Sequence, residues 1–354
     1  MESAIPEHLL CPRTRERRIP DDYAPPYPAW VARHPSSVSQ VVMAYYGVQY
    51  RDAGHTAAAC AALRQFLDAA AGGDPELRPG HHDIARYRDE AGYDTLMLIA
   101  YWDDPARHDR WWAQPALQRW WGDDDRLAGP VGLFREVVCP PVQRYETLFS
   151  TPDRFEGVAV TASGLSGDVQ EHAYWGGMRD RIPLSQTDPM KPEGRLGVVG
   201  GWKPGARVGV VPAHNVAMIR SGQEWTDTVD RERTLYLEQM EPVLREGMDY
   251  LRDRGVPIGC FTNRYMTHLG ADGQPQQKSF GLSYWRSLAD MERWSESHPT
   301  HVAIFGTFMR IVQELNFDLK LRLYHEVSVL TAEQQQFEYL NCHPKTGLLN
   351  GVAV

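Results

Sequence analysis

Three short patterns occur twice in this chain of 354 residues, in the same order each time. One such match arises easily by chance, but three in register indicate an internal duplication. The matched segments are Val41-x-Met43-x-x-x-Gly47 and Val216-x-Met218-x-x-x-Gly222, Tyr101-Trp102 and Tyr284-Trp285, and Leu133-Phe134-Arg135-Glu136-Val137 and Leu323-Tyr324-His325-Glu326-Val327. The chain is therefore expected to fold as two similar halves.

Each half shows the same succession of a strand, a helix, a strand, a second helix rich in aromatic residues and a final strand. We expect strands at 41–49, 95–102 and 133–138 in the first half and at 215–221, 279–285 and 321–330 in the second, with long helices at 56–71 and 232–254. This succession is typical of the β-α-β-β-α-β, or ferredoxin-like, unit. Two such units can pack their sheets together as an α+β barrel with the helices outside.

The repeat also predicts how the chain is divided. Closely spaced prolines exclude a helix near the start, so residues 1–40 are expected to form an extended arm with aromatic side chains. The expected segments are the arm at 1–40, the first half at 41–150, an irregular connection rich in Gly and Pro at 151–213, the second half at 214–330, and a C-terminal helix and tail at 331–354.

Composition limits the possible partners. A formal net charge of -9 argues against nucleic acid, because phosphate binding needs a basic surface. No apolar run has the roughly 18 residues of a membrane span, so no membrane association is expected. The start of the chain lacks the basic and apolar regions of a signal peptide, which favours a cytoplasmic protein.

The five cysteines are scattered and never form a CxxC pair. A disulfide framework or a zinc knuckle is therefore not expected. Cys11 and Cys139 each precede a proline, and we interpret them as turn residues.

The two halves differ at a few positions that bear on chemistry. Where the first half has Tyr46, the second has Ser221, and His325 stands in place of Arg135. The second half also gains His298 and His301. These differences predict that the second half carries the functional site.

Periodicity places these polar residues on apolar faces. Pro299 fits the first turn of a helix, with Ser297 upstream as a candidate cap. His301 then shares one helix face with Ile304, Phe305, Phe308, Ile311 and Val312. In the last strand, His325 alternates in phase with Leu321, Leu323, Val327 and Val329, and Ser221 shares a strand face with Ala217 and Ile219.

Two interpretations of such histidines stay open on this pattern. A histidine on an apolar face is commonly a core residue with its hydrogen bonds satisfied. Alternatively, one inward histidine without neighbouring Asp, Glu or Cys ligands suits the axial ligand of a haem better than a zinc site. His325 would then be available as an acid or base above the iron.

Several longer motifs resemble those of the bacterial aldoxime dehydratases, over nearly the whole chain. They are Tyr174-Trp175-Gly176-Gly177-Met178-Arg179, Ile219-Arg220-Ser221-Gly222-Gln223, Glu292-Arg293-Trp294-Ser295-Glu296-Ser297-His298-Pro299-Thr300-His301 and Leu323-Tyr324-His325-Glu326-Val327-Ser328-Val329. Members of that family use haem b, with ferrous iron in the active state, to convert aldoximes to nitriles. The resemblance implies a homodimer of α+β barrels, each built from two ferredoxin-like halves.

The resemblance also assigns roles to residues of this chain. It implies His301 as the proximal ligand of the haem iron, rather than His298. The implied catalytic residues are His325, Ser221 and Arg179, where His325 protonates the oxime hydroxyl and the other two orient it. Two nearby residues are weighed against these: Arg181 is interpreted as a structural ion-pairing residue and Glu146 as a surface carboxylate.

Two further functions are compatible with the same fold. One is a haem peroxidase or an enzyme like chlorite dismutase. The other is a haem-binding sensor or carrier without turnover. The joint presence of Ser221, Arg179 and His325 favours the dehydratase.

Overall fold

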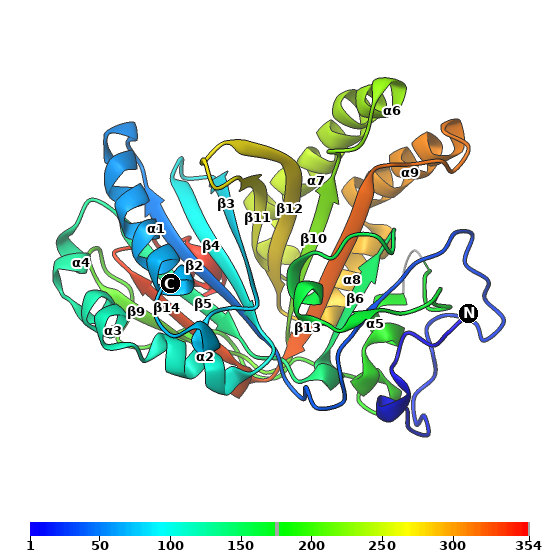
Figure 1. Ribbon diagram of the computed structural model, residues 1–354, viewed down its shortest axis with the longest axis horizontal. Coiled ribbons are helices and arrows are strands. Elements are labelled where there is room, and N and C mark those ends of the chain that lie inside the picture. The colour runs from blue at the N-terminus through cyan, green and yellow to red at the C-terminus, as the bar shows by residue number, and fades with distance from the viewer. Residues whose placement is uncertain (174–176, 353–354) are drawn as a thin grey trace.

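The computed structural model describes residues 1–173 and 177–352 (Figure 1). Tyr174, Trp175 and Gly176 of the first quoted motif lie outside the described residues. The fold is a mixed α/β arrangement around one curled, twelve-stranded antiparallel sheet. The strands of this sheet, in spatial order, are β6 (Tyr145–Phe149), β13 (Arg322–Leu330), β10 (Val216–Glu224), β12 (Pro275–Trp285), β11 (Cys260–Leu269), β3 (His81–Arg88), β4 (Asp94–Trp102), β2 (Val42–Tyr50), β5 (Gly132–Val138), β14 (Gln335–Leu340), β9 (Arg207–Val211) and β8 (Gly197–Val198).

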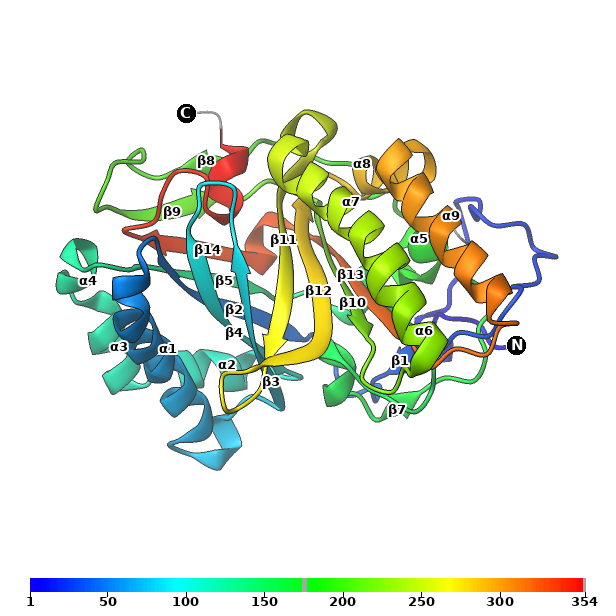
Figure 2. The ribbon, with the colours of Figure 1, turned by 90° about the horizontal axis from the view of Figure 1, so that it is seen from above.

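Helices cover the outer sides of this sheet (Figure 2). They are α1 (Thr56–Ala71), α2 (Pro105–Trp112), α3 (Pro115–Gly122), α4 (Asp125–Ala128), α5 (Gly177–Arg181), α6 (Asp230–Leu235), α7 (Glu241–Arg254), α8 (Leu288–Ser297) and α9 (Pro299–Glu314). The helix expected at 56–71 is confirmed. The one expected at 232–254 contains a π turn, Tyr236–Met240, just before Pro242, whose missing N–H interrupts the regular bonding pattern.

The two halves place equivalent elements in the same spatial order. In the first, β2, β3, β4 and β5 lie in the order β3-β4-β2-β5, and in the second, β10 to β13 lie in the order β11-β12-β10-β13. The halves are joined where β11 pairs with β3, through Thr267–Leu269 and Ile84–Arg86. This pairing makes the sheets of the two halves continuous. The halves share one open sheet, whose edge strands among the described residues are β6 and β8.

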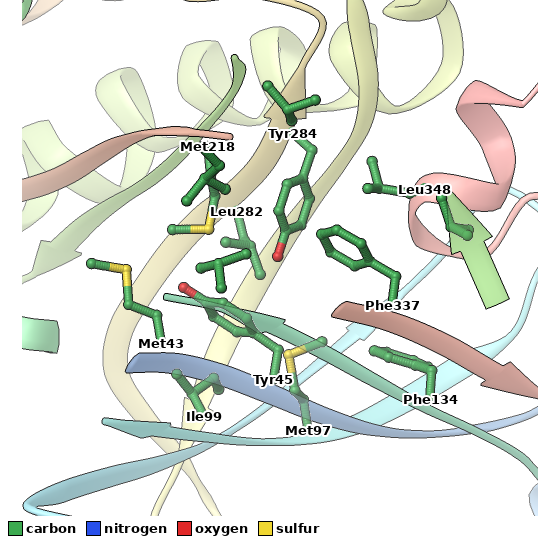
Figure 3. Packing of buried hydrophobic residues seen from close by; sticks show 14 of the residues in the cluster. Met43, Tyr45, Met97, Ile99, Phe134, Met218, Leu282, Tyr284, Phe337 and Leu348 are labelled. Carbon is green, nitrogen blue, oxygen red and sulfur yellow. The ribbon is translucent and has the colours of Figure 1, made fainter. Parts of the chain in front are cut away.

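A continuous apolar core fills the space between the two half-sheets (Figure 3). Met43, Tyr45 and Ile99 of the first half pack there with Met218 and Tyr284 of the second. Two further clusters lie on the opposite faces, between each half-sheet and its helices. Each half-sheet is therefore covered on both faces. The alternation of apolar and polar residues in β13 would suggest one solvent-exposed face, but both of its faces are covered.

The end of the chain differs from expectation. Residues 331–352 contain the strand β14 between short 3₁₀ turns, and none of these described residues lies in an α-helix. Phe337 and Tyr339 of β14 point into the central core, while Gln336 and Glu338 alternate with them. The period of two identifies a strand, which the Ala-Glu-Gln run before it conceals.

The N-terminal arm lies across the connection between the halves. Its strand β1 (Ala32–Arg33) pairs with β7 (Gly164–Leu165) in a separate two-stranded sheet. Glu2 forms a bridge with Val169. Within 1–173 and 177–352, none of the helices combines the length and the apolar character needed to cross a bilayer.

Candidate active site

The structure brings Ser221 and His325 side by side. They are directly opposed partners on the neighbouring strands β10 and β13, so both side chains lie on the same face of the sheet. This face also carries Ala217, Val327 and Val329, which pack toward the helices. The His325 side chain is 24% exposed, so its ring borders the space between the sheet and its helices.

Two charged residues hold the ring of His325. Glu146, on the edge strand β6, places Oε1 3.0 Å from the Nε2 atom of His325. Arg181, the last residue of α5, places Nη2 2.9 Å from the same nitrogen. Arg181 also donates from Nε to Oε2 of Glu146 over 2.7 Å, and both side chains of this ion pair are almost wholly buried. The expected surface position of Glu146 is therefore wrong, because β6 pairs with β13 and brings it inside.

This pair gives His325 a partner in either charge state. A guanidinium only donates hydrogen bonds, so Nε2 of the neutral ring accepts from Arg181. When Nε2 is protonated, it donates to Glu146 instead. Burial alone raises the pKa of Glu146, but the charges of Arg181 and His325 outweigh it and hold that pKa below its usual range. The carboxylate is thus kept ionised beside the histidine.

The structure does not bring Arg179 to this group. Its Nε and Nη2 atoms donate to Glu292 of α8 over 2.9 and 2.6 Å, and its Nη1 donates to the carbonyl of Pro189. Among the described residues, Arg181 is the arginine that contacts His325. Its predicted ion pairing is present, but with Glu146 and at the candidate site.

His301 lies in the first turns of α9, and its ring packs edge-on against Trp294 with centroids 4.5 Å apart. Burial lowers the pKa of His301 to about 4, although a hydrogen bond with the backbone of Ser295 opposes the shift. The imidazole is therefore neutral, which is the form that binds a metal. One ring nitrogen bonded to a backbone group is also the usual arrangement of a metal-ligating histidine.

His298 has a different task. It is the N-cap of α9, where its side chain accepts a hydrogen bond from the backbone N–H of Thr300. The cap is therefore His298, whereas the hydroxyl of Ser297, another candidate, donates to the backbone carbonyl of Arg293 within α8. His301 is left as the histidine on the apolar side of the helix.

The apolar face beyond His301 is only partly covered by protein. Ile311 is buried in a cluster that includes Leu323 of β13, whereas Ile304 and Phe308 of the same helix face are half-buried. A neutral histidine next to half-covered apolar side chains fits a flat, largely apolar macrocycle. Among the described residues, no cluster of three His, Cys, Asp or Glu could hold a bare metal ion.

A neutral helix histidine with an apolar surround and a hydrogen-bonded group of histidine, carboxylate and arginine are residue types that suit a haem enzyme with proton-transfer chemistry. Comparison with known proteins narrows this class. The chain belongs to the family of haem-containing dehydratases, whose model matches residues 44–348.

Named relatives cover the chain almost completely. An aliphatic aldoxime dehydratase of Pseudomonas chlororaphis is 47% identical over 100% of this chain and 99% of its own length. A phenylacetaldoxime dehydratase of Bacillus sp. (strain OxB-1) is 33% identical over 94% of each chain. The crystal structure of an aldoxime dehydratase in complex with butyraldoxime superposes with a TM-score of 0.95 at 45% identity, covering 100% of this chain and 97% of that one.

Proposed function

We propose that this protein removes water from aldoximes to form nitriles, with aliphatic aldoximes as preferred substrates. The observation that carries the proposal is the full-length similarity, at 47% identity, to an aliphatic aldoxime dehydratase. The lower identity of 33% to a phenylacetaldoxime dehydratase supports the alkyl preference. Ser221, His325, Glu146 and Arg181 supply the polar groups that this reaction needs.

The residues also suit the cofactor. His301 would hold the iron of haem b from the α9 side, with the half-buried apolar residues of α9 and β13 against the ring. When bound, ferrous haem supplies a coordination position for the oxime nitrogen and the electron density that weakens the N–O bond. Everything else in the reaction is the movement of two protons, which falls to side chains of this chain.

The first proton must go to the oxime hydroxyl, because hydroxide is a poor leaving group. Ser221 is small enough to admit the oxime beside His325, and its hydroxyl can hydrogen-bond the oxime oxygen. Protonated His325, held by Glu146, donates its proton to that oxygen, and water leaves. The neutral ring then takes the proton from the aldoxime carbon, so the histidine returns to its starting state when the nitrile forms.

The cationic member of the site is assigned to Arg181. The resemblance placed this role on Arg179, but the contact with His325 and Glu146 supports Arg181, two residues later. The Arg181 charge stabilises the negative charge that develops on the oxime oxygen before protonation. Arg179 would then serve to hold α5 through Glu292.

A nitrile assay tests the function directly. Haem-loaded protein is reduced with dithionite under nitrogen and given butyraldoxime or phenylacetaldoxime, and the products are separated by gas chromatography. We expect butyronitrile to form with a higher kcat/KM than phenylacetonitrile. Turnover of peroxide or chlorite without any nitrile would instead indicate the peroxidase-type alternative.

We also infer that the halves are ferredoxin-like pseudo-repeats and that the protein acts as a homodimer. The equal strand orders of the two halves support the first inference. The assembly is tested by light scattering, where a mass near twice the 40.2 kDa of one chain is expected. A single-chain mass at micromolar concentration would contradict it.

A further inference from the structure

The N-terminal arm is bound to the short helix that carries Arg181. Asp180 of α5 is 1% exposed, and its carboxylate accepts hydrogen bonds from the backbone N–H groups of Arg18 and Ile19. The distances are 2.8 Å from Arg18 and 2.9 Å from Ile19 to Oδ2. Among the described residues, these amides are the hydrogen-bond partners of the Asp180 side chain. A buried carboxylate bound by two amides fixes the arm and α5 to each other.

A second contact joins the arm to Arg181 through Glu171. The Glu171 carboxylate accepts from the N–H of Ala4 over 2.8 Å and pairs with Arg17 over 3.2 Å. Its backbone carbonyl accepts from Nη1 of Arg181 over 2.6 Å. The arm therefore holds the residue that orients the far end of the Arg181 guanidinium.

The side chain of Arg181 passes close to Gly177 of its own helix. A Cβ at Gly177 would lie 3.0 Å from Nη1 of Arg181 and 3.2 Å from the carbonyl oxygen of Glu171. Glycine at this position therefore avoids tight contacts with the Arg181 side chain and with the Glu171 carbonyl. On the other side of α5, the pair of Arg179 and Glu292 binds the helix to α8.

We propose that the arm is part of the framework of the active site: by binding Asp180 and Glu171, residues 4 and 17–19 hold Arg181 in place against His325 and Glu146. Asp180 is thus a positioning residue for the reaction. The inference rests on the proposed function for its effect on turnover, but the structural link itself does not depend on any substrate.

A displacement of Arg181 should change the pKa of Glu146, because the charge of Arg181 lowers that pKa. Arg181 from α5 and His325 from β13 contact Glu146. Three further titratable groups line the cavity of about 40 Å³ beneath the arm that Glu146 and Arg181 also line, namely His8, His34 and Tyr145. Burial lowers the pKa of His34 to about 4 and raises the pKa of Tyr145, so Tyr145 is also neutral. His34 is therefore neutral, and Arg181 provides the permanent positive charge beside Glu146. Withdrawal of Arg181 raises the pKa of Glu146 toward that of an unpaired buried carboxyl.

The test is Asp180→Asn, which keeps the shape but replaces one acceptor oxygen by an NH₂ group facing an amide donor. We expect faster hydrogen exchange at residues 17–19 and 177–181, and a kcat lowered roughly tenfold with KM and haem content unchanged, since small misplacements of a catalytic group are costly. The acidic limb of the pH profile should move to higher pH. The matched control is Asp22→Asn, which removes an exposed acid of the same arm, and it should change none of these.

Glu171→Gln serves as a second variant if Asp180→Asn fails to fold, because it weakens the other tie and keeps the backbone carbonyl. Faster exchange in the arm with an unmoved acidic limb and an unchanged kcat would overturn the positioning role. Unchanged exchange at α5 would overturn the tie itself. Absence of nitrile formation by the parent protein would overturn the proposed function, whereas the exchange result would still decide the tie.

Discussion

The two halves of this molecule share a strand order but use the space between sheet and helices differently. In the first half, Tyr46 and Arg135 are opposed partners on β2 and β5, as Ser221 and His325 are on β10 and β13. Tyr46 is fully buried and bonds to His108 over 2.9 Å, and Arg135 stacks over Trp112 at 4.3 Å. The first half therefore packs aromatic side chains around these two positions, where the second half has Ser221 and the partly exposed His325.

Under the proposed function, this difference in side chains is what gives the second half its site. The backbone register is kept, and the change lies in a few side chains: a tyrosine becomes a serine, an arginine becomes a histidine, and a helix gains a histidine. The tryptophans of the first half then contribute packing, in a cluster that includes Trp102, Trp111 and Trp121.

Substitution of His325, the opposed partner of Ser221, is expected to have the largest effect on kcat. His325→Ala should retain haem but lower kcat by about 10²–10⁴-fold, because the acid–base group is lost. Steady-state nitrile formation at equal haem content measures this. Arg135→Ala, at the equivalent position of the first half, is the control and should leave kcat within a factor of about two. Equal losses in both variants would show that the halves do not differ in role.

Substitutions at the equivalent positions Tyr46 and Ser221 test whether the two halves fill the space between sheet and helices differently. Tyr46→Ser removes a buried ring and should lower the free energy of unfolding by about 3–5 kcal/mol, as for other large-to-small changes in a core. Ser221→Tyr should instead cost little stability and reduce haem uptake, since the ring would occupy the ligand space. Urea unfolding and haem absorbance measure the two effects. Haem uptake by Ser221→Tyr equal to that of the parent would contradict the account.

Acid titration tests the contribution of Glu146 to stability, since this carboxylate belongs to the charged group around His325 in the second half. The pKa of Glu146 is held below its ordinary value of 4.5 in the folded protein, so its contribution to stability is complete above that value and is lost as pH falls through the lowered pKa. Below about pH 4.5, stability of the parent should therefore fall more steeply with decreasing pH than that of Glu146→Gln. Urea unfolding at a series of pH values checks this, and parallel curves would contradict it.

The smallest expected effect concerns the cap of α9. His298→Ala should cost about 1 kcal/mol of stability through the lost bond to the Thr300 amide, and should keep the haem. Thermal unfolding of the holoprotein measures the first and its absorbance the second. Loss of haem in this variant would move the ligand assignment away from His301.

Much of the framework follows from local patterns. The helix α1 and the apolar strands β4 and β5 were predictable because their side chains repeat with the period of the element. β3 was not, because its sequence is polar and it is held as a strand by pairing with β4 and β11. The twelve-stranded sheet likewise depends on long-range pairings, of β11 with β3, β6 with β13 and β14 with β5.

The candidate site, like the framework, is predictable from local patterns in some features and depends on long-range contacts in others. Alternation places Ser221 and His325 on helix-facing sides of their strands, but only the register between β10 and β13 makes them neighbours. The choice between Arg179 and Arg181 depends on the rotation of a five-residue helix, on which residues two apart point in nearly opposite directions. Glu326, beside His325, is buried on the other face by bonds from Tyr101 and Val158, which no local pattern indicates.

The central claim is that the second half holds haem through His301. The most direct measurement is the haem absorbance of His301→Gly, purified with and without imidazole in the buffer. The account predicts a protein almost free of haem, which regains a normal Soret band when imidazole fills the space of the missing ring. A full haem complement with an unchanged spectrum and no response to imidazole would contradict it.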